Sequence, residues 1–116
     1  MRTAALVNRG EILVSKVEMA LSLPERIRGL LGRHACPPGE AMWISPCSSV
    51  HTFFMHFSID VFFMDRDLCV VEIIHDVVPN RIAAGGFRAR SVLETGTGWL
   101  GSSIMKGDRI QLIDHS

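Results

Sequence analysis

Residues 50–65 read VHTFFMHFSIDVFFMD, and this stretch decides which kind of fold the chain can form. It is rich in phenylalanine, valine and isoleucine, which are residues that favour strands. We therefore predict strands at 50–57 and 59–64. The Asp-Arg-Asp triplet at 65–67 predicts a hairpin turn that leads into another strand at 69–75.

Strand-like segments continue on both sides of this stretch. An Asn-Arg-Gly turn at 8–10 predicts a hairpin near the start of the chain. The remaining predicted strands are 3–7, 11–14 with a continuation at 16–21, 41–44, 91–94 and 109–113. Because strands follow strands, the pattern favours an α+β fold over alternating βαβ units. We expect a mainly antiparallel sheet, open or partly closed into a barrel, with two short helices.

The first of these helices is predicted to begin after Ser22. The Ser22 side chain can accept hydrogen bonds from the free backbone N–H groups of the first turn, and Glu25 can bond back to the cap. The apolar residues expected to form its buried stripe are Ile27, Leu30 and Leu31. Gly32 is expected to end the helix.

The second helix is predicted after Thr97, whose hydroxyl can cap it. Leu100 and Ile104 lie four residues apart, so they would pack together on one helical face. Gly107 is expected to end this helix before the last strand.

The composition is that of one domain spanning residues 1–116. The chain has 12 acidic and 12 basic side chains, and its formal charge is zero. A nucleic-acid-binding surface needs an excess of lysine and arginine, so nucleic acid is not an expected partner. The apolar runs are far shorter than the about 20 residues that span a bilayer, so no membrane partner is expected either. The oligomeric state is not predicted.

The cysteines indicate the compartment. Cys36, Cys47 and Cys69 are an odd number and form no CxxC pair, which suits free thiols in a reducing environment. The apolar run near the N-terminus is shorter than the about 7–15 residues of a secretory signal. We therefore expect a cytoplasmic location.

A candidate soft-metal site comprises Cys47, His51 and Met55, which are spaced four residues apart. In a strand, four residues span about 13 Å, whereas two ligands of one ion lie within about 4 Å of each other. Only a helix or a sharp bend would bring these side chains together. Because the local composition favours a strand, neither a metal nor another cofactor is expected.

Three polar residues stand in apolar surroundings. A buried carboxylate at Asp60 must find hydrogen-bond donors or a cation, so this residue either ties down a loop through backbone N–H groups or belongs to a site. Glu94 follows Val92 and Leu93, and Arg26 lies in the first helix. A buried pair of Glu94 and Arg26 would be a structural salt bridge.

Three stretches of the sequence, in this order and spacing, resemble one family. They are RIRGLLGR at 26–33, the stretch at 50–65 quoted above, and the VLE triplet at 92–94 with Gly98 and then Gly107-Asp108. The chain resembles the prokaryotic family known only as domain of unknown function one hundred and ninety-two, from about Arg9 to Ile113. The resemblance implies a compact fold rich in β-structure, without an established activity or cofactor.

The motifs of this family match most of the positions of interest. The helix motif is matched by Arg26 with Gly29-Leu30, the Ile-Asp pair by Ile59-Asp60, and the glutamate after Val-Leu by Glu94. At position 56 the chain has His56, where the family more often has arginine or lysine. The resemblance therefore does not imply a permanent cation at this position.

The sequence favours a binding or interaction module, with a pocket for a small molecule or a peptide. Its candidate ligand-binding residues are Arg26, His51, Met55, Asp60 and Glu94. The alternative is a small hydrolase in which His51 acts as a general base oriented by Asp60 or Glu94, which requires a contact of about 3 Å or a link through one water. A third possibility is a structural or regulatory partner with a broad apolar surface patch. The sequence alone does not decide whether the protein is an enzyme.

Overall fold

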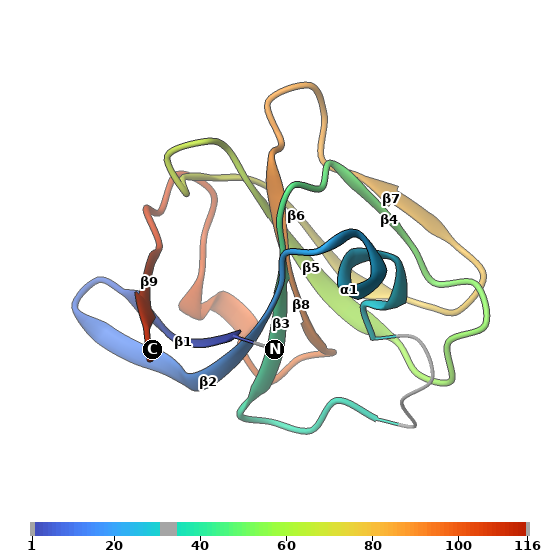
Figure 1. Ribbon diagram of the computed structural model, residues 1–116, viewed down its shortest axis with the longest axis horizontal. Coiled ribbons are helices and arrows are strands. Elements are labelled where there is room, and N and C mark those ends of the chain that lie inside the picture. Colours follow the sequence, from blue (N-terminus) through green and yellow to red (C-terminus); the bar gives the residue numbers. More distant parts are fainter. Residues whose placement is uncertain (1, 31–34, 116) are drawn as a thin grey trace.

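The structure, a computed structural model, describes residues 2–30 and 35–115, apart from the side chains of Ile27 and Arg28. These residues form nine strands, one α-helix and one 3-10 helix (Figure 1). In chain order, the elements are β1 (Arg2–Asn8), β2 (Glu11–Ala20), α1 (Leu23–Arg28), β3 (Glu40–Ile44), β4 (Ser49–His51), β5 (Ile59–Met64), β6 (Val70–Val77), β7 (Ile82–Ala84), β8 (Ser91–Gly96), η1 (Gly101–Ser103) and β9 (Gln111–Asp114).

Seven strands form one sheet in the order β6-β5-β8-β3-β2-β1-β9, and β4 and β7 form a separate two-stranded sheet. Within the large sheet, β2 and β3 are parallel and the other neighbours are antiparallel. The prediction of a mainly antiparallel sheet is therefore confirmed. The sheet is not closed, so the alternative of a barrel is not supported.

The central strands β5 and β8 are buried along their whole length, and the sheet carries a hydrophobic core on each face. Alternate residues of a strand point to opposite faces. Val61 and Phe63 pack with Val92 in one core, whereas Phe62 packs with Leu93 in the other. Neighbouring residues of these strands therefore serve different cores, which decides where their polar residues point.

The hairpin of β1 and β2 is confirmed. Its two connecting residues, Arg9 and Gly10, have positive φ angles of 53° and 75°. This conformation belongs to the turns whose twist matches that of the flanking strands. Strand β2 continues to Ala20 with bulges in its pairing to β1, as the alternation at 16–21 predicted.

The start of α1 is confirmed and its end is corrected. Ser22 Oγ accepts a hydrogen bond from Glu25 N at 3.3 Å, and Glu25 Oε1 accepts one from Ser22 N at 3.1 Å. The helix ends at Arg28, four residues before the expected Gly32, because Gly29 leaves helical geometry with φ 47° and ψ −128°. Leu30 is buried, whereas the Ile27 side chain, Leu31 and Gly32 lie outside the described residues.

The prediction of a second helix after Thr97 is wrong, because only the three-residue turn η1 forms in this segment. Gly98 and Gly101 adopt positive φ angles of 91° and 53°, which an α-helix does not contain. Leu100 and Ile104 are nevertheless buried in one core cluster. The α+β class with two helices is thus not supported, and the fold is mainly β.

The predicted strand at 50–57 is also corrected, because strand structure stops at His51. Thr52 is fully buried, and its hydroxyl donates to Val78 O at 2.6 Å and accepts from Arg81 N at 2.9 Å. The chain then turns, with a φ of 66° at Phe54 and a hydrogen bond from Met55 N to Thr52 O at 3.2 Å. Contacts with residues 78–81 thus override the strand preference of this segment.

No helix in residues 2–30 and 35–115 has the length and apolar character needed to cross a membrane.

Candidate functional site

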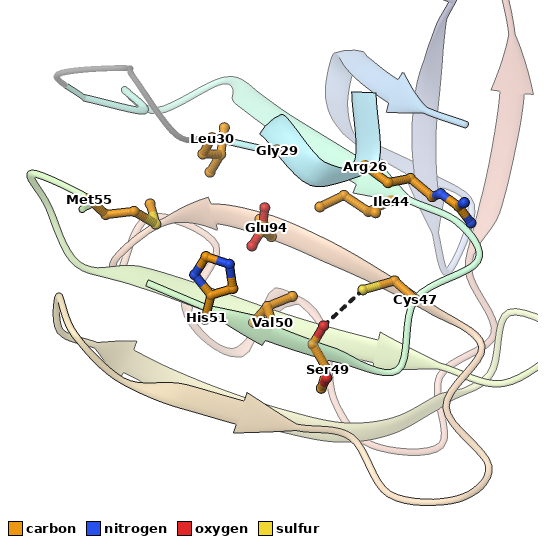
Figure 2. A pocket seen from close by; sticks show the side chains of 10 residues that line it. All are labelled: Arg26, Gly29, Leu30, Ile44, Cys47, Ser49, Val50, His51, Met55 and Glu94. Atoms are coloured by element: carbon orange, nitrogen blue, oxygen red, sulfur yellow. Dashed lines mark hydrogen bonds between the residues drawn. The ribbon is translucent and has the colours of Figure 1, made fainter. Parts of the chain in front are cut away.

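A cavity of about 260 Å³ lies between the end of α1 and strand β4 (Figure 2). Its lining residues come from α1 and its cap, β3, β4, β8 and the loops around β4. They are Arg26, Gly29, Leu30, Ile44, Cys47, Ser49, Val50, His51, Met55 and Glu94. We call this space the Glu94 cavity, because Figure 2 shows the Glu94 carboxyl in the middle of the lining side chains.

Four of the five candidate residues predicted from the sequence line this cavity: Arg26, His51, Met55 and Glu94. The turn at residues 52–55 brings His51 and Met55 to one space, although an extended segment would hold them far apart. Cys47 lines the same cavity and donates its thiol hydrogen to Ser49 O at 3.1 Å. Within the described residues, however, no group of three or more His, Cys, Asp or Glu side chains could hold a metal ion.

Glu94 is the most deeply buried polar residue of the cavity, with 4% of its surface exposed. On β8 it faces Met42 of β3 and Val61 of β5, so apolar neighbours flank it on both sides. Burial raises the pKa of the Glu94 carboxyl from 4.5 to about 7, because a low-dielectric surrounding disfavours the charged form. Among the described residues, none forms a hydrogen bond or an ion pair with this carboxyl.

Arg26 does not form the salt bridge with Glu94 that the sequence allowed. Its Nη1 lies 3.4 Å from Pro46 O, and Figure 2 shows the guanidinium extending away from the Glu94 carboxyl. Its Nε is buried without a hydrogen-bond partner in the part of the chain that the structure describes. The helix end thus places a cation on the cavity wall without neutralising the acid.

Gly29 keeps the space beside Glu94 open. A Cβ atom at this position would lie 3.4 Å from Glu94 Oε1 and 3.5 Å from Ile44 Cδ1. Its φ of 47° is also in the region that L-residues rarely adopt. Glycine therefore serves both the abrupt end of α1 and the shape of the cavity.

His51 lies on the exposed side of the cavity and stacks on Phe53, with ring centroids 5.2 Å apart. Its ring forms no hydrogen bond with Asp60 or Glu94 in the described structure. No direct contact among the described residues therefore orients His51 as a general base.

Asp60, the fifth candidate residue, does not line the Glu94 cavity. Its carboxylate accepts hydrogen bonds from Asp76 N at 2.8 Å and Gly98 N at 2.9 Å, and His75 Nδ1 lies 3.2 Å from its Oδ2. This is the loop-fixing role that the sequence left open. Asp60 and His75 line a separate surface hollow of about 620 Å³, next to Thr97 and Gly98.

The separation of Asp60 from Glu94 follows from the sheet register. Asp60 pairs with Thr95, whereas Glu94 pairs with Val61, so the two carboxylates point to opposite faces.

Sequence reasoning missed His75 as the histidine beside Asp60, and it missed Ile44, Ser49 and Val50 as cavity residues. Gly29 was visible within the family motif, but nothing in the sequence indicated its closeness to Glu94.

The fold and the cavity together define the class of protein: a mainly β domain with a small cavity lined by a buried glutamate. A family model described as "Uncharacterized ACR", DUF192, matches residues 4–112, and the chain belongs to this family. This confirms the resemblance seen in the sequence. A comparison with the curated proteins found no match.

Two solved structures are similar to this chain. One is a protein of unknown function from Novosphingobium aromaticivorans DSM 12444, with a TM-score of 0.80 and 21% identity over 94% of this chain and 83% of the other. The second, from Sinorhizobium meliloti 1021, was provisionally assigned as a transcription regulator, and it has a TM-score of 0.80 and 21% identity over 96% of this chain and 92% of the other. At this level of identity, the comparison shows a shared fold.

Proposed function

We propose that this protein is a binding module, and that its Glu94 cavity holds a small molecule or a single side chain of a peptide. Its volume of about 260 Å³ lies just below the about 300–1,000 Å³ that is usual for pockets of drug-sized ligands. An apolar wall with a few polar groups is also the usual make-up of such sites. The size therefore favours a compact ligand or one inserted side chain.

One observation carries this proposal: the Glu94 carboxyl is buried, yet it borders an open space. A carboxyl group that only stabilised the fold would be expected to find its hydrogen-bond partners in the protein, as Asp60 does. Glu94 has none among the described residues, and Gly29 leaves the space beside it free. A ligand in the cavity would supply the missing partner.

Among the described residues, no direct contact supports the hydrolase predicted as an alternative. Its general base, His51, stacks on Phe53, and its proposed orienting residue Asp60 is bonded to Asp76, Gly98 and His75. We therefore favour binding over hydrolysis.

An NMR fragment titration tests the proposal. With methyl-labelled protein and a panel of small cations, anions and neutral compounds, a bound compound should shift the methyl signals of Met55 and Val50 in a saturable manner. The methyl signal of Met105 is the internal control, because this residue lines the hollow near His75. If no compound in the panel moves the Met55 and Val50 signals, the proposal is wrong.

A further inference from the structure

We infer that the ligand of the Glu94 cavity is an organic cation, namely a primary ammonium group on a short alkyl chain. This inference rests on the proposed function and adds the chemical class of the ligand. It is carried by three features together: a buried carboxyl without a described partner, an apolar wall around it, and a space that Gly29 keeps open.

The carboxyl group selects for a donor with positive charge. An ionised carboxylate only accepts hydrogen bonds, whereas an ammonium group offers three N–H donors and the opposite charge. Charge-assisted hydrogen bonds of this kind are stronger than neutral ones. A fully apolar compound would leave the buried Glu94 carboxyl without a hydrogen-bond partner, and an anion could accept a hydrogen bond only from its protonated form.

Among the described residues that line the cavity, Glu94 carries the only carboxyl group, and the permanent cation, Arg26, extends away from it (Figure 2). Arg26 on α1 has its guanidinium at Pro46 O, and His51 on β4 stacks on Phe53 at the exposed side. Burial raises the pKa of the Cys47 thiol, so this group stays neutral near pH 7. The strands next to Glu94 present Met42 and Val61, which do not titrate.

The apolar wall selects for the alkyl chain. Leu30, Ile44, Val50 and Met55 surround the space beside the carboxyl (Figure 2). Each methylene group that is buried on binding should tighten the affinity about threefold to fourfold. The series from ethylammonium to n-butylammonium should therefore bind with increasing affinity until the chain fills the cavity.

Binding of a cation should also be coupled to the proton on Glu94. Burial raises the pKa of this carboxyl to about 7, so at pH 6 Glu94 is mostly protonated in the ligand-free protein. A cation that binds at pH 6 must therefore displace the proton of Glu94. The affinity for n-butylammonium should be about tenfold weaker at pH 6 than at pH 8. A ligand carboxylate would show the opposite trend, because it would share the proton of the neutral acid.

The test compares n-butylammonium with 1-butanol and butyrate, by calorimetry and by the Met55 and Val50 methyl signals. Glu94→Gln keeps the shape but removes the charge, and it should weaken n-butylammonium binding about tenfold or more. Glu72→Gln is the matched control, because Glu72 lies on β6 beside Lys106 and outside the cavity. His51→Gln should retain the pH dependence, which assigns that dependence to Glu94.

The outcomes separate this inference from the proposed function. If 1-butanol or butyrate binds in the cavity as tightly as n-butylammonium, or if Glu94→Gln binds n-butylammonium as well as the unchanged protein does, the cation inference is wrong while the binding function stands. If none of the three compounds moves the Met55 and Val50 signals, the inference is wrong, and the wider fragment panel decides on the binding function.

Two sources of the ammonium group can be distinguished in the same assay. The peptide acetyl-Gly-Lys-Gly-amide presents a lysine side chain, and its norleucine analogue lacks the charge. Tighter binding of the lysine peptide than of n-butylammonium supports a lysine side chain of a partner protein as the natural ligand. Binding of n-butylammonium alone supports a free small amine.

Discussion

Asp60 and Glu94 are buried carboxylates on neighbouring strands, yet their surroundings differ. Asp60 has two backbone N–H donors and His75 within hydrogen-bond reach. Glu94 faces the opposite side of the sheet and has no hydrogen-bond partner among the described residues. Burial alone therefore does not determine the role of a carboxylate. The number of donors around it separates a structural carboxylate from a candidate binding residue.

The largest expected effect is the pH-dependent stabilisation by Glu94→Gln. Because burial raises the folded-state pKa above the unfolded value of 4.5, Glu94 contributes stability that is fully present below pH 4.5 and is lost as the pH rises through about 7. Glutamine cannot ionise and avoids this loss. At pH 8 the variant should be more stable by about 3 kcal/mol, and at pH 4 about equal to the unchanged protein.

Urea denaturation at both pH values checks this prediction. Glu72→Gln serves as the control and should show no such pH-dependent gain, because its carboxylate is on the surface. A Glu94→Gln variant that is less stable at pH 8 than the unchanged protein would mean that the carboxylate has a partner in the fold.

The opposite sign is expected at Asp60. Asp60→Ala leaves the N–H groups of Asp76 and Gly98 without their acceptor and should destabilise the protein by about 2 kcal/mol at pH 7. Urea denaturation measures the change, with Asp67→Ala on the exposed turn as the control. If Asp60→Ala loses as little stability as Asp67→Ala, the hydrogen bonds of Asp60 do not stabilise the fold. The proposed difference between Asp60 and Glu94 would then be wrong.

A smaller effect is expected for Gly29→Ala, which should destabilise the protein by about 1–2 kcal/mol because φ at this position is positive. Gly10→Ala is the matched comparison, since φ is also positive there and no atom lies near its Cβ position. Both variants should lose stability, but only Gly29→Ala should weaken ligand binding in the Glu94 cavity. Equal binding by the two variants would show that the space beside Glu94 is not used.

The smallest effect is expected for His75→Ala, with a loss of less than about 1 kcal/mol. The side chain of His75 is 52% exposed, and solvent weakens its interaction with Asp60. Thermal unfolding in parallel with Asp60→Ala measures both changes. A loss as large as that of Asp60→Ala would show that the histidine, and not the backbone donors, is the main partner of this carboxylate.

Local patterns predicted much of the fold. The hairpin at residues 8–10, the capping box at Ser22 and the central strands β5 and β8 depend on neighbours in the sequence, and all are present. The segment at 52–57 has strand composition, but Thr52 bonds to Val78 and Arg81, which lie far along the chain. No local pattern shows such contacts, so this turn was not predicted.

For the candidate site, the sequence predicted which carboxylates are buried but not that they lie on opposite faces of the sheet. Polar residues in apolar sequence correctly indicated burial at Asp60 and Glu94. Their separation depends on the register of β5 against β8, which places Asp60 opposite Thr95 and Glu94 opposite Val61. The sequence alone does not give this register, so Asp60 was grouped with residues that lie on the other side of the sheet.

The titration of Glu94 in the ligand-free protein tests the central claim most directly. The side-chain carboxyl carbon of Glu94, labelled with ¹³C, reports its ionisation in an NMR titration. A buried carboxyl without a charge partner should titrate with a midpoint near pH 7. A midpoint near the ordinary value of 4.5 would show that the group is hydrated or paired, and would contradict the account.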